Sequence, residues 1–497
     1  MLKIMRLVKL ICRQDFLKYH KISYPKTSNV DYPMSEINET NTRICPSKPK
    51  SSNGCWLTTS DQSSLFQKLN LDLQFNDTIN RQRSTIVVDS DHAYQTMDGF
   101  GFTLTGGSAY LLRKLDGPIR NALLYELFST QDNAIGISYL RLSIGASDLS
   151  TAPYSYDDIP EGQNDLNLIH FNILAGDFEV IPILHQILSI NPTIQIMATP
   201  WSAPAWMKTN NSMIGGSLRC EYYDVYAKYF VKYIQSMKEY GITIQAITPQ
   251  NEPQNDLNEP SMLMDAKEQA NFIKFHLGPA LRMAGLTTDI FCWDHNCDRP
   301  DYPLAIFADA EAERFTKGSA WHLYAGDIDV LSSIHEAYPH KKIYFTEQWV
   351  GSDGQFGGDL LWHGRNVLIG AIRNWSSVVL EWNLAADPYY NPHTTGGASN
   401  CVGALTIGDT IQRNVAYYLI AHVAKFVRPN SVRIHTETDC ALLNVGFMTP
   451  DHTVVLVVLN DSEMDMDFNI QIRQRQAACN IPALALASFV WQDLPED

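Results

Sequence analysis

The segment ITIQAITPQNE, residues 242–252, contains the pattern that decides the fold. Its first part is rich in β-branched and apolar residues, which favour a β-strand. Its last part is polar and ends in Asn251 and Glu252. The segment therefore predicts a buried strand whose carboxyl end carries chemically reactive side chains.

The same order, apolar first and polar last, recurs between about residues 97 and 428. Similar strands are predicted at 99–105, 138–145, 194–202, 289–295, 319–324, 343–350 and 378–385. Helical periodicity lies between strands, for example at 178–190, 222–239 and 265–284. Eight strand–helix units predict an α/β fold, the (β/α)8 or TIM barrel. A doubly wound open sheet is the alternative, but it would gather polar residues at one switch point, whereas here they end most strands.

Short β-rich runs without helical periodicity follow the predicted barrel, among them VRIHTET, TVVLVVLN and ALASFVW. They predict an appended antiparallel β-sandwich built mainly from the C-terminus, to which residues 65–75 add a strand. The predicted division is a poorly ordered basic leader and linker at 1–55, N-terminal sandwich strands at 56–96, the barrel at 97–428 and the sandwich at 429–497.

The net charge of the 497-residue chain is −16, and it is unevenly spread. The first 50 residues hold ten Lys and Arg against four Asp and Glu, a net of +6, so the remainder carries −22. Acidic chains repel phosphate backbones, which excludes nucleic acid as a partner. No stretch reaches the roughly 20 apolar residues of a transmembrane helix. Arg6 and Lys9 interrupt the apolar run at the N-terminus, so no signal peptide is predicted there.

Glu252 and Glu347 lie at the ends of two predicted strands that are far apart in the chain. A single glutamate at such a position is usually a solvated or salt-bridged loop residue. A barrel, however, brings all its strand ends to one rim, and both glutamates have amide or aromatic neighbours suited to sugars. Two carboxylates at one site are the groups that hydrolyse glycosidic bonds, and Asn251 adds an amide for the sugar 2-hydroxyl.

Six motifs in the predicted barrel resemble glycoside hydrolase family 30, whose two catalytic glutamates lie on strands 4 and 7. They are GFGFTLTGGSA (99–109), ATPWSAPAWMKTN (198–210), TPQNEPQN (248–255), WHLY (321–324), YFTEQWVG (344–351) and EWNLAADP (381–388). The resemblance covers residues 97–497 and is greatest to the glucosylceramidases, or acid β-glucosidases, of that family.

The resemblance implies a role for each matching residue. Glu252 would be the acid/base, Glu347 the nucleophile, and Arg141 the cation that keeps Glu347 ionised. The other implied substrate-binding residues are Asn251, Trp201, Tyr324, His322, Trp382, Asn383 and Asp148. One departure concerns the turn after the first strand, where the lysosomal branch has an aspartate that contacts glucose and this chain has Gly106.

The resemblance thus implies a retaining β-glycosidase that acts on glucosylceramide or a related β-glucoside through a covalent glycosyl-enzyme. Two alternatives remain open: a family 30 hydrolase of β-1,6-glucan, β-xylosides or β-fucosides, and a carbohydrate-binding barrel without catalysis. Gly106 and the long loop at 386–408 motivate the first of these. The family resemblance also implies a secreted, periplasmic or lysosomal location and allows transient contact with a membrane surface.

No cofactor and no metal are predicted. The run CWDHNC at 292–297 has Cys, Asp and His side chains, but their spacing fits no zinc site. A position at the rim of the barrel or in a disulfide is the interpretation that this run favours.

Overall fold

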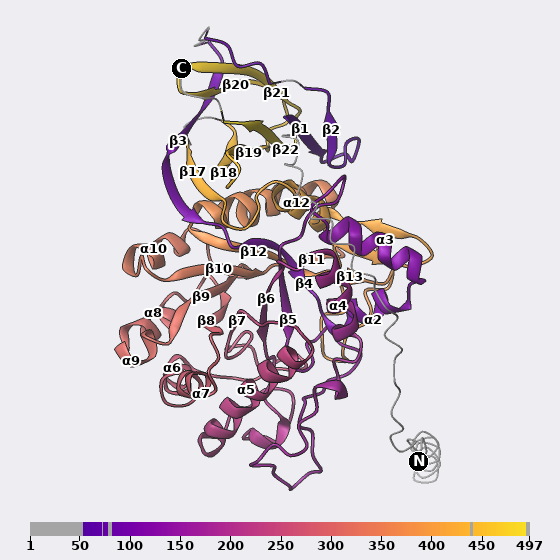
Figure 1. Ribbon diagram of the computed structural model, residues 1–497, viewed down its shortest axis with the longest axis vertical. Helices are drawn as coiled ribbons and strands as arrows, with labels where there is room; N and C mark the ends of the chain where they lie inside the picture. Colours follow the sequence, from indigo (N-terminus) through magenta and orange to yellow (C-terminus); the bar gives the residue numbers. More distant parts are fainter. Residues whose placement is uncertain (1–52, 72, 78–81, 438–440, 494–497) are drawn as a thin grey trace, which may run out of the picture. The chain divides into compact units, whose positions relative to one another are not determined.

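The computed structural model describes residues 53–71, 73–77, 82–437 and 441–493, and two β assemblies form its framework (Figure 1). Most of the predicted leader at 1–55 lies outside the described residues. Among the described helices, none combines the length and the apolar run needed to cross a membrane.

The first assembly is a closed barrel of parallel strands in the order β10-β12-β4-β5-β6-β7-β8-β9. The strands are β4 (Gly99–Thr103), β5 (Tyr139–Ser143), β6 (Gln195–Thr199), β7 (Ala246–Ile247), β8 (Asp289–Asn296), β9 (Thr316–His322), β10 (Lys342–Glu347) and β12 (Ser376–Asn383). Each predicted strand segment overlaps one of them, and the predicted (β/α)8 fold is confirmed.

Side chains fill the inside of the barrel. Tyr344 stacks on Phe291 with ring centroids 4.0 Å apart and meets the edge of Tyr139 at 5.8 Å. Met197 and Val378 belong to the same buried cluster. The barrel interior is therefore a packed core, and the polar groups that end the strands are confined to its carboxyl-terminal face.

Helices cover the outside of the barrel (Figure 1). They are α2 (Gly106–Lys114), α3 (Gly117–Phe128), α4 (Val180–Ile190), α5 (Tyr223–Glu239), α6 (Ala266–Phe272), α7 (Gly278–Met283), α8 (Asp301–Ala308), α9 (Ala310–Glu313), α10 (Val330–Ala337), α11 (Phe356–His363) and α12 (Val415–Ala424). A capping box begins α6: Asp265 accepts from the backbone of Glu268, and Glu268 accepts from that of Asp265. A π-helical turn, η4 (Ile273–Leu277), continues α6 into α7, so the predicted helix at 265–284 is one irregular helix.

The second assembly is a nine-stranded sheet in the order β2-β1-β22-β19-β18-β17-β3-β20-β21. Its strands are β1 (Gly54–Thr59), β2 (Gln67–Leu69), β3 (Ser84–Thr96), β17 (Val432–Thr436), β18 (Leu443–Met448), β19 (Thr453–Asn460), β20 (Met466–Ile472), β21 (Arg475–Ile481) and β22 (Ala485–Gln492). Phe468 of β20 packs on Phe489 of β22 at 5.6 Å, although four strands separate β20 from β22 in this order. The sheet must therefore fold back on itself, which gives the predicted β-sandwich.

Helix α12 joins the two assemblies, and every residue in it is buried. In Figure 1 it lies between the sandwich and the barrel strands. The ring of His422 bonds the hydroxyl of Thr58 on β1 at 2.9 Å and that of Ser488 on β22 at 2.8 Å. Because burial is not offset by any charged partner, the pKa of His422 is lowered to about 3. This junction is therefore neutral and hydrogen-bonded.

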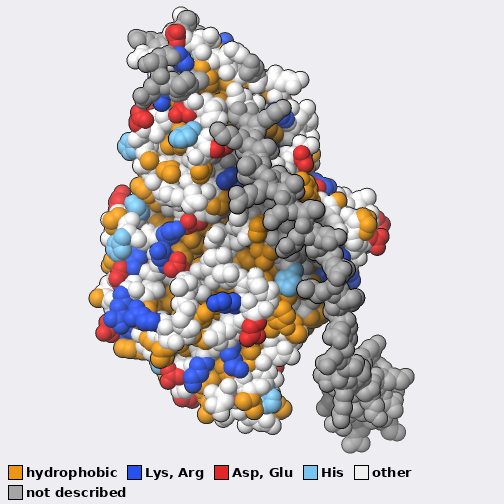
Figure 2. Space-filling view, in the orientation of Figure 1, with side chains coloured by type: hydrophobic (Ala, Val, Ile, Leu, Met, Phe, Trp, Pro, Cys, Tyr) orange, Lys and Arg blue, Asp and Glu red, His pale blue; other side chains and the backbone are white. Residues whose placement is uncertain are grey.

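Short strands organise the segments that follow β10 and β12. They are β11 (Val350–Gly351), β13 (Ala385–Ala386), β14 (Cys401–Val402), β15 (Leu405–Ile407) and β16 (Ile411–Arg413). The pairing of β14 with β11 and of β15 with β13 holds the predicted loop at 386–408 above the barrel. On the face seen in Figure 2, acidic and basic side chains are interspersed.

Candidate active site

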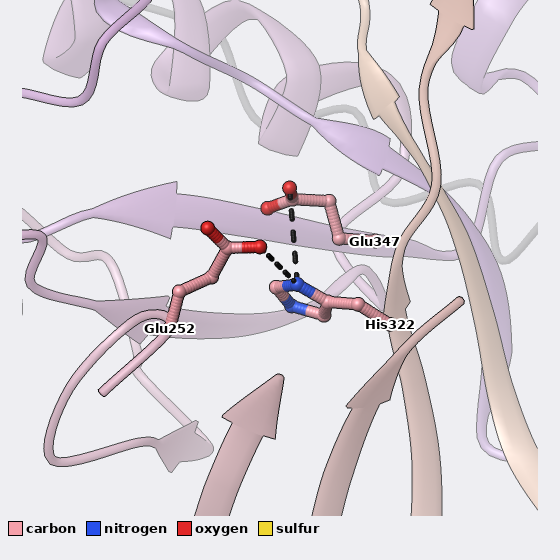
Figure 3. A group of neighbouring side chains, drawn as sticks. All are labelled: Glu252, His322 and Glu347. Carbon is pink, nitrogen blue, oxygen red and sulfur yellow. Dashed lines mark hydrogen bonds and ion pairs between the residues drawn. The ribbon is translucent and has the colours of Figure 1, made fainter. Parts of the chain in front are cut away.

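The two glutamates predicted to be catalytic meet at the carboxyl-terminal face of the barrel. Glu347 is the last residue of β10, and Glu252 lies in the loop that follows β7. Their carboxylates point toward one another with His322, the last residue of β9, beside them (Figure 3). One oxygen of each carboxylate lies within 4.8 Å of the other. Retaining glycosidases hold their two carboxyl groups about 5–5.5 Å apart, so this spacing suits the retaining mechanism.

Both oxygens of Glu347 accept hydrogen bonds. Arg141 Nη1 donates to Oε2 at 2.6 Å, and the Tyr324 hydroxyl donates to Oε1 at 3.0 Å. The guanidinium of Arg141 is fully buried and lies 4.9 Å from the ring centre of Trp201 and 5.5 Å from that of Trp382. The aromatic walls and the ion pair together fix the position of Glu347.

Glu252 is held by a different set of donors. His322 Nδ1 bonds its Oε1 at 3.1 Å, and Asn255 Nδ2 donates to its Oε2 at 2.8 Å. Its backbone has φ +45°, in the left-handed region that a non-glycine residue seldom adopts. The backbone N–H donates to the carbonyl of Asp294 at 3.0 Å, which helps to hold this conformation.

Asp294 of β8 bonds both Arg141 and His322, the partners of the two glutamates. It accepts from Arg141 Nη2 at 2.9 Å, bonds His322 Nε2 at 3.1 Å, and accepts from the hydroxyls of Thr248 and Thr346, each at 2.7 Å. Burial acts to raise its pKa, but the charge of Arg141 and the bonds from His322 and Thr346 hold that pKa far below its ordinary value. Asp294 is therefore a carboxylate that orients both Arg141 and His322.

The side chains of this cluster shift one another's pKa values. Burial lowers the pKa of His322, but the charge of Glu347 and the bonds to Asp294 and Glu252 outweigh it and raise the pKa to about 9. Burial raises the pKa of Glu252, yet the hydrogen bond from His322 and the charge of His322 lower it to about 2. Burial raises the pKa of Glu347 despite His322 and Arg141. These directions leave Asp294 and Glu252 as the most acidic carboxylates of the cluster and put a proton on His322.

The glutamates lie in an open cavity of about 660 Å³. Its lining residues are Asp148, Glu252, Gln254, Asn255, Asp256, Leu257, Asn258, His295, Asn296, Tyr324, Glu347, Trp349, Trp382, Gly396, Gly397 and Ala398. Asp148 is buried in its wall; its Oδ1 has no hydrogen-bond partner among the described residues, and its Oδ2 accepts from the Ala398 N–H at 3.3 Å. Burial, followed by the charge of Glu347, raises the pKa of Asp148 to about 7.

The remaining predicted residues take up distinct positions. Trp201 stacks on Trp382 with ring centroids 5.2 Å apart, and Arg141 Nη2 donates to Asn251 Oδ1 at 2.6 Å. Asn383 accepts from the hydroxyls of Thr105 and Ser108 and so ties β12 to the start of α2. Gly106 begins α2, and a Cβ there would meet the Ser150 hydroxyl at 3.2 Å.

Sequence reasoning missed Asp294 and His295, which it had met only as members of CWDHNC. A signal was present, since this polar pair ends an apolar strand as Glu252 and Glu347 do. Cys292 and Cys297 of the same run are free buried thiols, which excludes the disulfide interpretation for this pair. Glu252, His322 and Glu347 offer a metal-like donor set, but His322 would first have to lose its proton.

A parallel barrel with two facing carboxylates at the ends of its strands is the arrangement of a glycoside hydrolase. Residues 97–427 match the glycosyl hydrolase family 30 TIM-barrel domain, and residues 430–489 match the family 30 beta sandwich domain. The chain therefore belongs to glycoside hydrolase family 30, as the motifs predicted.

Named relatives refine this assignment. The chain is 33% identical over 427 residues to an endo-1,6-beta-D-glucanase of Aspergillus fumigatus, covering 80% of this chain and 85% of that protein. The solved structure of the endo-beta1,6-glucanase BT3312 superimposes with a TM-score of 0.82 at 36% identity, covering 89% of this chain and 99% of that one. The mouse lysosomal acid glucosylceramidase is 27% identical over 416 residues, covering 78% and 79%. The finer likeness to glucosylceramidases is therefore not confirmed.

Proposed function

We propose that this family 30 hydrolase cleaves β-1,6-linked glucan within the chain and retains the anomeric configuration. The spacing of the Glu252 and Glu347 carboxylates supports the retaining chemistry. The similarity to proteins named endo-1,6-β-glucanases, at 32% to 36% identity, supports the substrate. This replaces glucosylceramide, the first expectation, with the alternative that Gly106 and the loop at 386–408 motivated.

In the first step, Glu347 attacks the anomeric carbon while Glu252 protonates the departing O6 oxygen. The C1–O6 bond breaks, a C1–carboxylate bond forms, and the shortened glucan leaves as an alcohol. The Arg141 guanidinium donates a hydrogen bond to the carbonyl oxygen of the Asn251 side chain. The N–H groups of that amide are thus left to donate to the sugar 2-hydroxyl.

This step needs a proton on Glu252, whose pKa is low without substrate, and an ionised Glu347. Hydrogen-bond geometry favours the ionised form of Glu347, because Arg141 and Tyr324 donate to both of its oxygens. The proton on His322 Nδ1 can transfer to Glu252 along the 3.1 Å hydrogen bond between Nδ1 and Oε1. A neutral His322 then accepts a hydrogen bond from the protonated Glu252 at Nδ1, while its Nε2–H continues to donate to Asp294.

In the second step, Glu252 takes a proton from water, and the hydroxide attacks C1. The bond between C1 and Glu347 breaks, the free carboxylate is restored, and the product has the β configuration. Two inversions at C1 thus give net retention.

A residue in the cavity wall can replace the aspartate that this chain lacks at position 106. Asp148 lies in the cavity wall with Oδ1 unpartnered, so this carboxyl group is available to glucose hydroxyls. A longer side chain at 106 would first have to displace Ser150. We infer that Asp148 grips the sugar in this chain.

A substrate panel tests the proposal. We expect hydrolysis of linear β-1,6-glucan to a mixture of oligosaccharides, with the β-anomer appearing first by NMR. Glucosylceramide, β-1,3-glucan, xylan and an aryl β-fucoside should be cleaved much more slowly. Glu347→Gln protein, purified in parallel, controls for contaminating enzymes. Preference for glucosylceramide, or an α-anomeric first product, would refute the proposal.

The polymeric substrate bears on location. A glucan does not cross a membrane, which supports action in a secreted, periplasmic or lysosomal space, the location that family membership favours.

A further inference from the structure

Strand β8 has an irregularity directly beside Glu252. Trp293 and Asp294 have φ of +74° and +67°, and the register with β9 shifts between Trp293 and His295. Successive side chains of a regular strand point to opposite faces, whereas a bulge can turn neighbours toward the same side. Here Asp294 bonds Arg141 inside the barrel, and the next residue, His295, lines the cavity.

The imidazole of His295 is buried and has no hydrogen-bond partner within the described part of the chain. Its exposed fraction is 9%, and Nδ1 is buried without a partner. Nε2 lies 3.8 Å from Glu252 Oε1, beyond hydrogen-bond length. A buried N–H without an acceptor is costly, so the ring proton belongs on Nε2, at the edge that faces Glu252 and the cavity. Burial lowers the pKa of His295, which keeps this ring neutral.

The strand order divides the cavity at the two glutamates. Glu252 follows β7 and Glu347 ends β10, and only β8 and β9 lie between them on one side of the closed barrel. Trp382 of β12 and Asp148, which follows β5, lie on the other side. Trp382, Asp148 and Asn251 are the groups proposed for the glucose that Glu347 attacks. The acid Glu252 faces the leaving oxygen, so the departing sugar lies toward β8.

We propose that His295 binds the departing glucose unit, with Nε2–H donating to one of its hydroxyl groups. His295 is then a specificity-determining residue for the leaving group, next to the acid that protonates it. The proposal rests on the proposed β-1,6-glucanase function. It explains why a polar ring lacks a protein partner at this position: the partner is the substrate.

The test uses two substrates that share a glycone and differ in the leaving group. β-1,6-glucotriose releases glucose, and dinitrophenyl β-gentiobioside releases a phenolate that needs neither a proton nor a sugar contact. The value of kcat/KM reports the steps up to departure of the leaving group for both. In His295→Leu we expect kcat/KM to fall about tenfold for glucotriose, the value of one hydrogen bond, and to stay within about threefold for the aryl substrate. His295→Gln, which restores a donor, should recover part of the loss.

Each other outcome has a definite meaning. An equal fall on both substrates would show that His295 only supports the architecture of the site, and no change on either would show no role; both overturn the proposal for His295. If wild-type protein cleaves the aryl substrate but not glucotriose or β-1,6-glucan, the proposed function fails, and the assignment of His295 fails with it.

Discussion

His322 at the mouth of the barrel and His422 at the junction with the sandwich are both fully buried, yet their pKa values move in opposite directions. His322 lies between the carboxylates of Glu252 and Asp294, and its pKa is raised to about 9. His422 lies between two hydroxyls, and its pKa is lowered to about 3. Burial acts against the charged form in both places, so the partners decide the outcome.

The comparison separates two uses of buried polarity. At the junction, the neutral hydrogen bonds of His422 join β1, α12 and β22. At the active site, the cations Arg141 and His322 face the carboxylates of Glu252, Glu347 and Asp294, and removing one partner leaves another charge buried and uncompensated. Catalysis needs the arrangement at the active site, because protons can transfer between its ionisable groups.

The largest expected effect comes from removing the nucleophile. Glu347→Gln keeps the shape of the side chain but cannot form the glycosyl-enzyme, so kcat should fall by at least about 10⁴-fold. Initial rates on β-1,6-glucan and on dinitrophenyl β-gentiobioside should fall alike. More than a tenth of wild-type activity on either substrate would disprove the role of Glu347.

Removing the acid should affect the two substrates unequally. Glu252→Gln should lower kcat/KM on β-1,6-glucan by about 10²–10⁴-fold. The aryl substrate should lose much less, because its leaving group departs without protonation. In Glu252→Ala, added azide should give a β-glycosyl azide, detectable by mass spectrometry and NMR. An equal loss on both substrates, without azide product, would rule against Glu252 as the acid.

Removing the buried cation should cost stability as well as activity. Arg141→Met leaves the buried carboxylates of Asp294 and Glu347 with His322 as their remaining cation, so the free energy of unfolding should fall by about 3–5 kcal/mol. Arg413 pairs with Glu126 in a more exposed setting, and Arg413→Met should cost about 1 kcal/mol or less. Urea unfolding measures both, with Arg141→Lys as a third variant that keeps the charge. Similar costs at the two sites would contradict the contrast between buried and exposed pairs.

The most gradual expected effect, spread over several pH units, is on the pH dependence of stability. A raised pKa in the folded state means that His322 stabilises the fold below about pH 6.5 and loses this contribution as pH rises toward 9. A lowered pKa means that His422 stabilises it above about pH 6.5 and loses this contribution as pH falls toward 3. Each limb has a slope of up to about 1.4 kcal/mol per pH unit.

Substitution tests the two limbs separately. His422→Gln should cost less stability at pH 4 than at pH 7, and His322→Gln should cost less at pH 9 than at pH 6. Urea unfolding of each variant beside wild type at these pH values gives the differences. A cost that does not change with pH at either residue would remove the distinction drawn between the two histidines.

Much of this architecture follows from local sequence pattern. Apolar runs ending in polar residues predicted the barrel strands and the rim positions of Glu252, Glu347, Tyr324 and His322, because strand period and strand direction are local properties. The role of Arg141 came from the family resemblance, and the sandwich from short β-rich runs without helical periodicity after residue 428.

What sequence pattern missed depends on local backbone geometry or on distant partners. Asp294 and His295 face the site because Trp293 and Asp294 adopt left-handed backbone conformations. Neither residue is a glycine, so the sequence gives no sign of this conformation. Asn383 accepts hydrogen bonds from Thr105 and Ser108, a contact between residues far apart in the chain that sequence pattern does not show, and its contact with substrate stays a prediction. Loops such as 396–398 also line the cavity, and hydrophobic period carries no information about their conformation.

Helix α12 has a consequence for how the molecule unfolds. A helix buried on every side belongs to the core of the barrel, through β4 and β12, and also contacts β22 of the sandwich. Neither module can melt without exposing apolar surface on the other, so heat should dismantle barrel and sandwich in one cooperative transition. The sandwich is thus part of the thermodynamic unit that keeps the catalytic rim in place, although none of its strands reaches that rim.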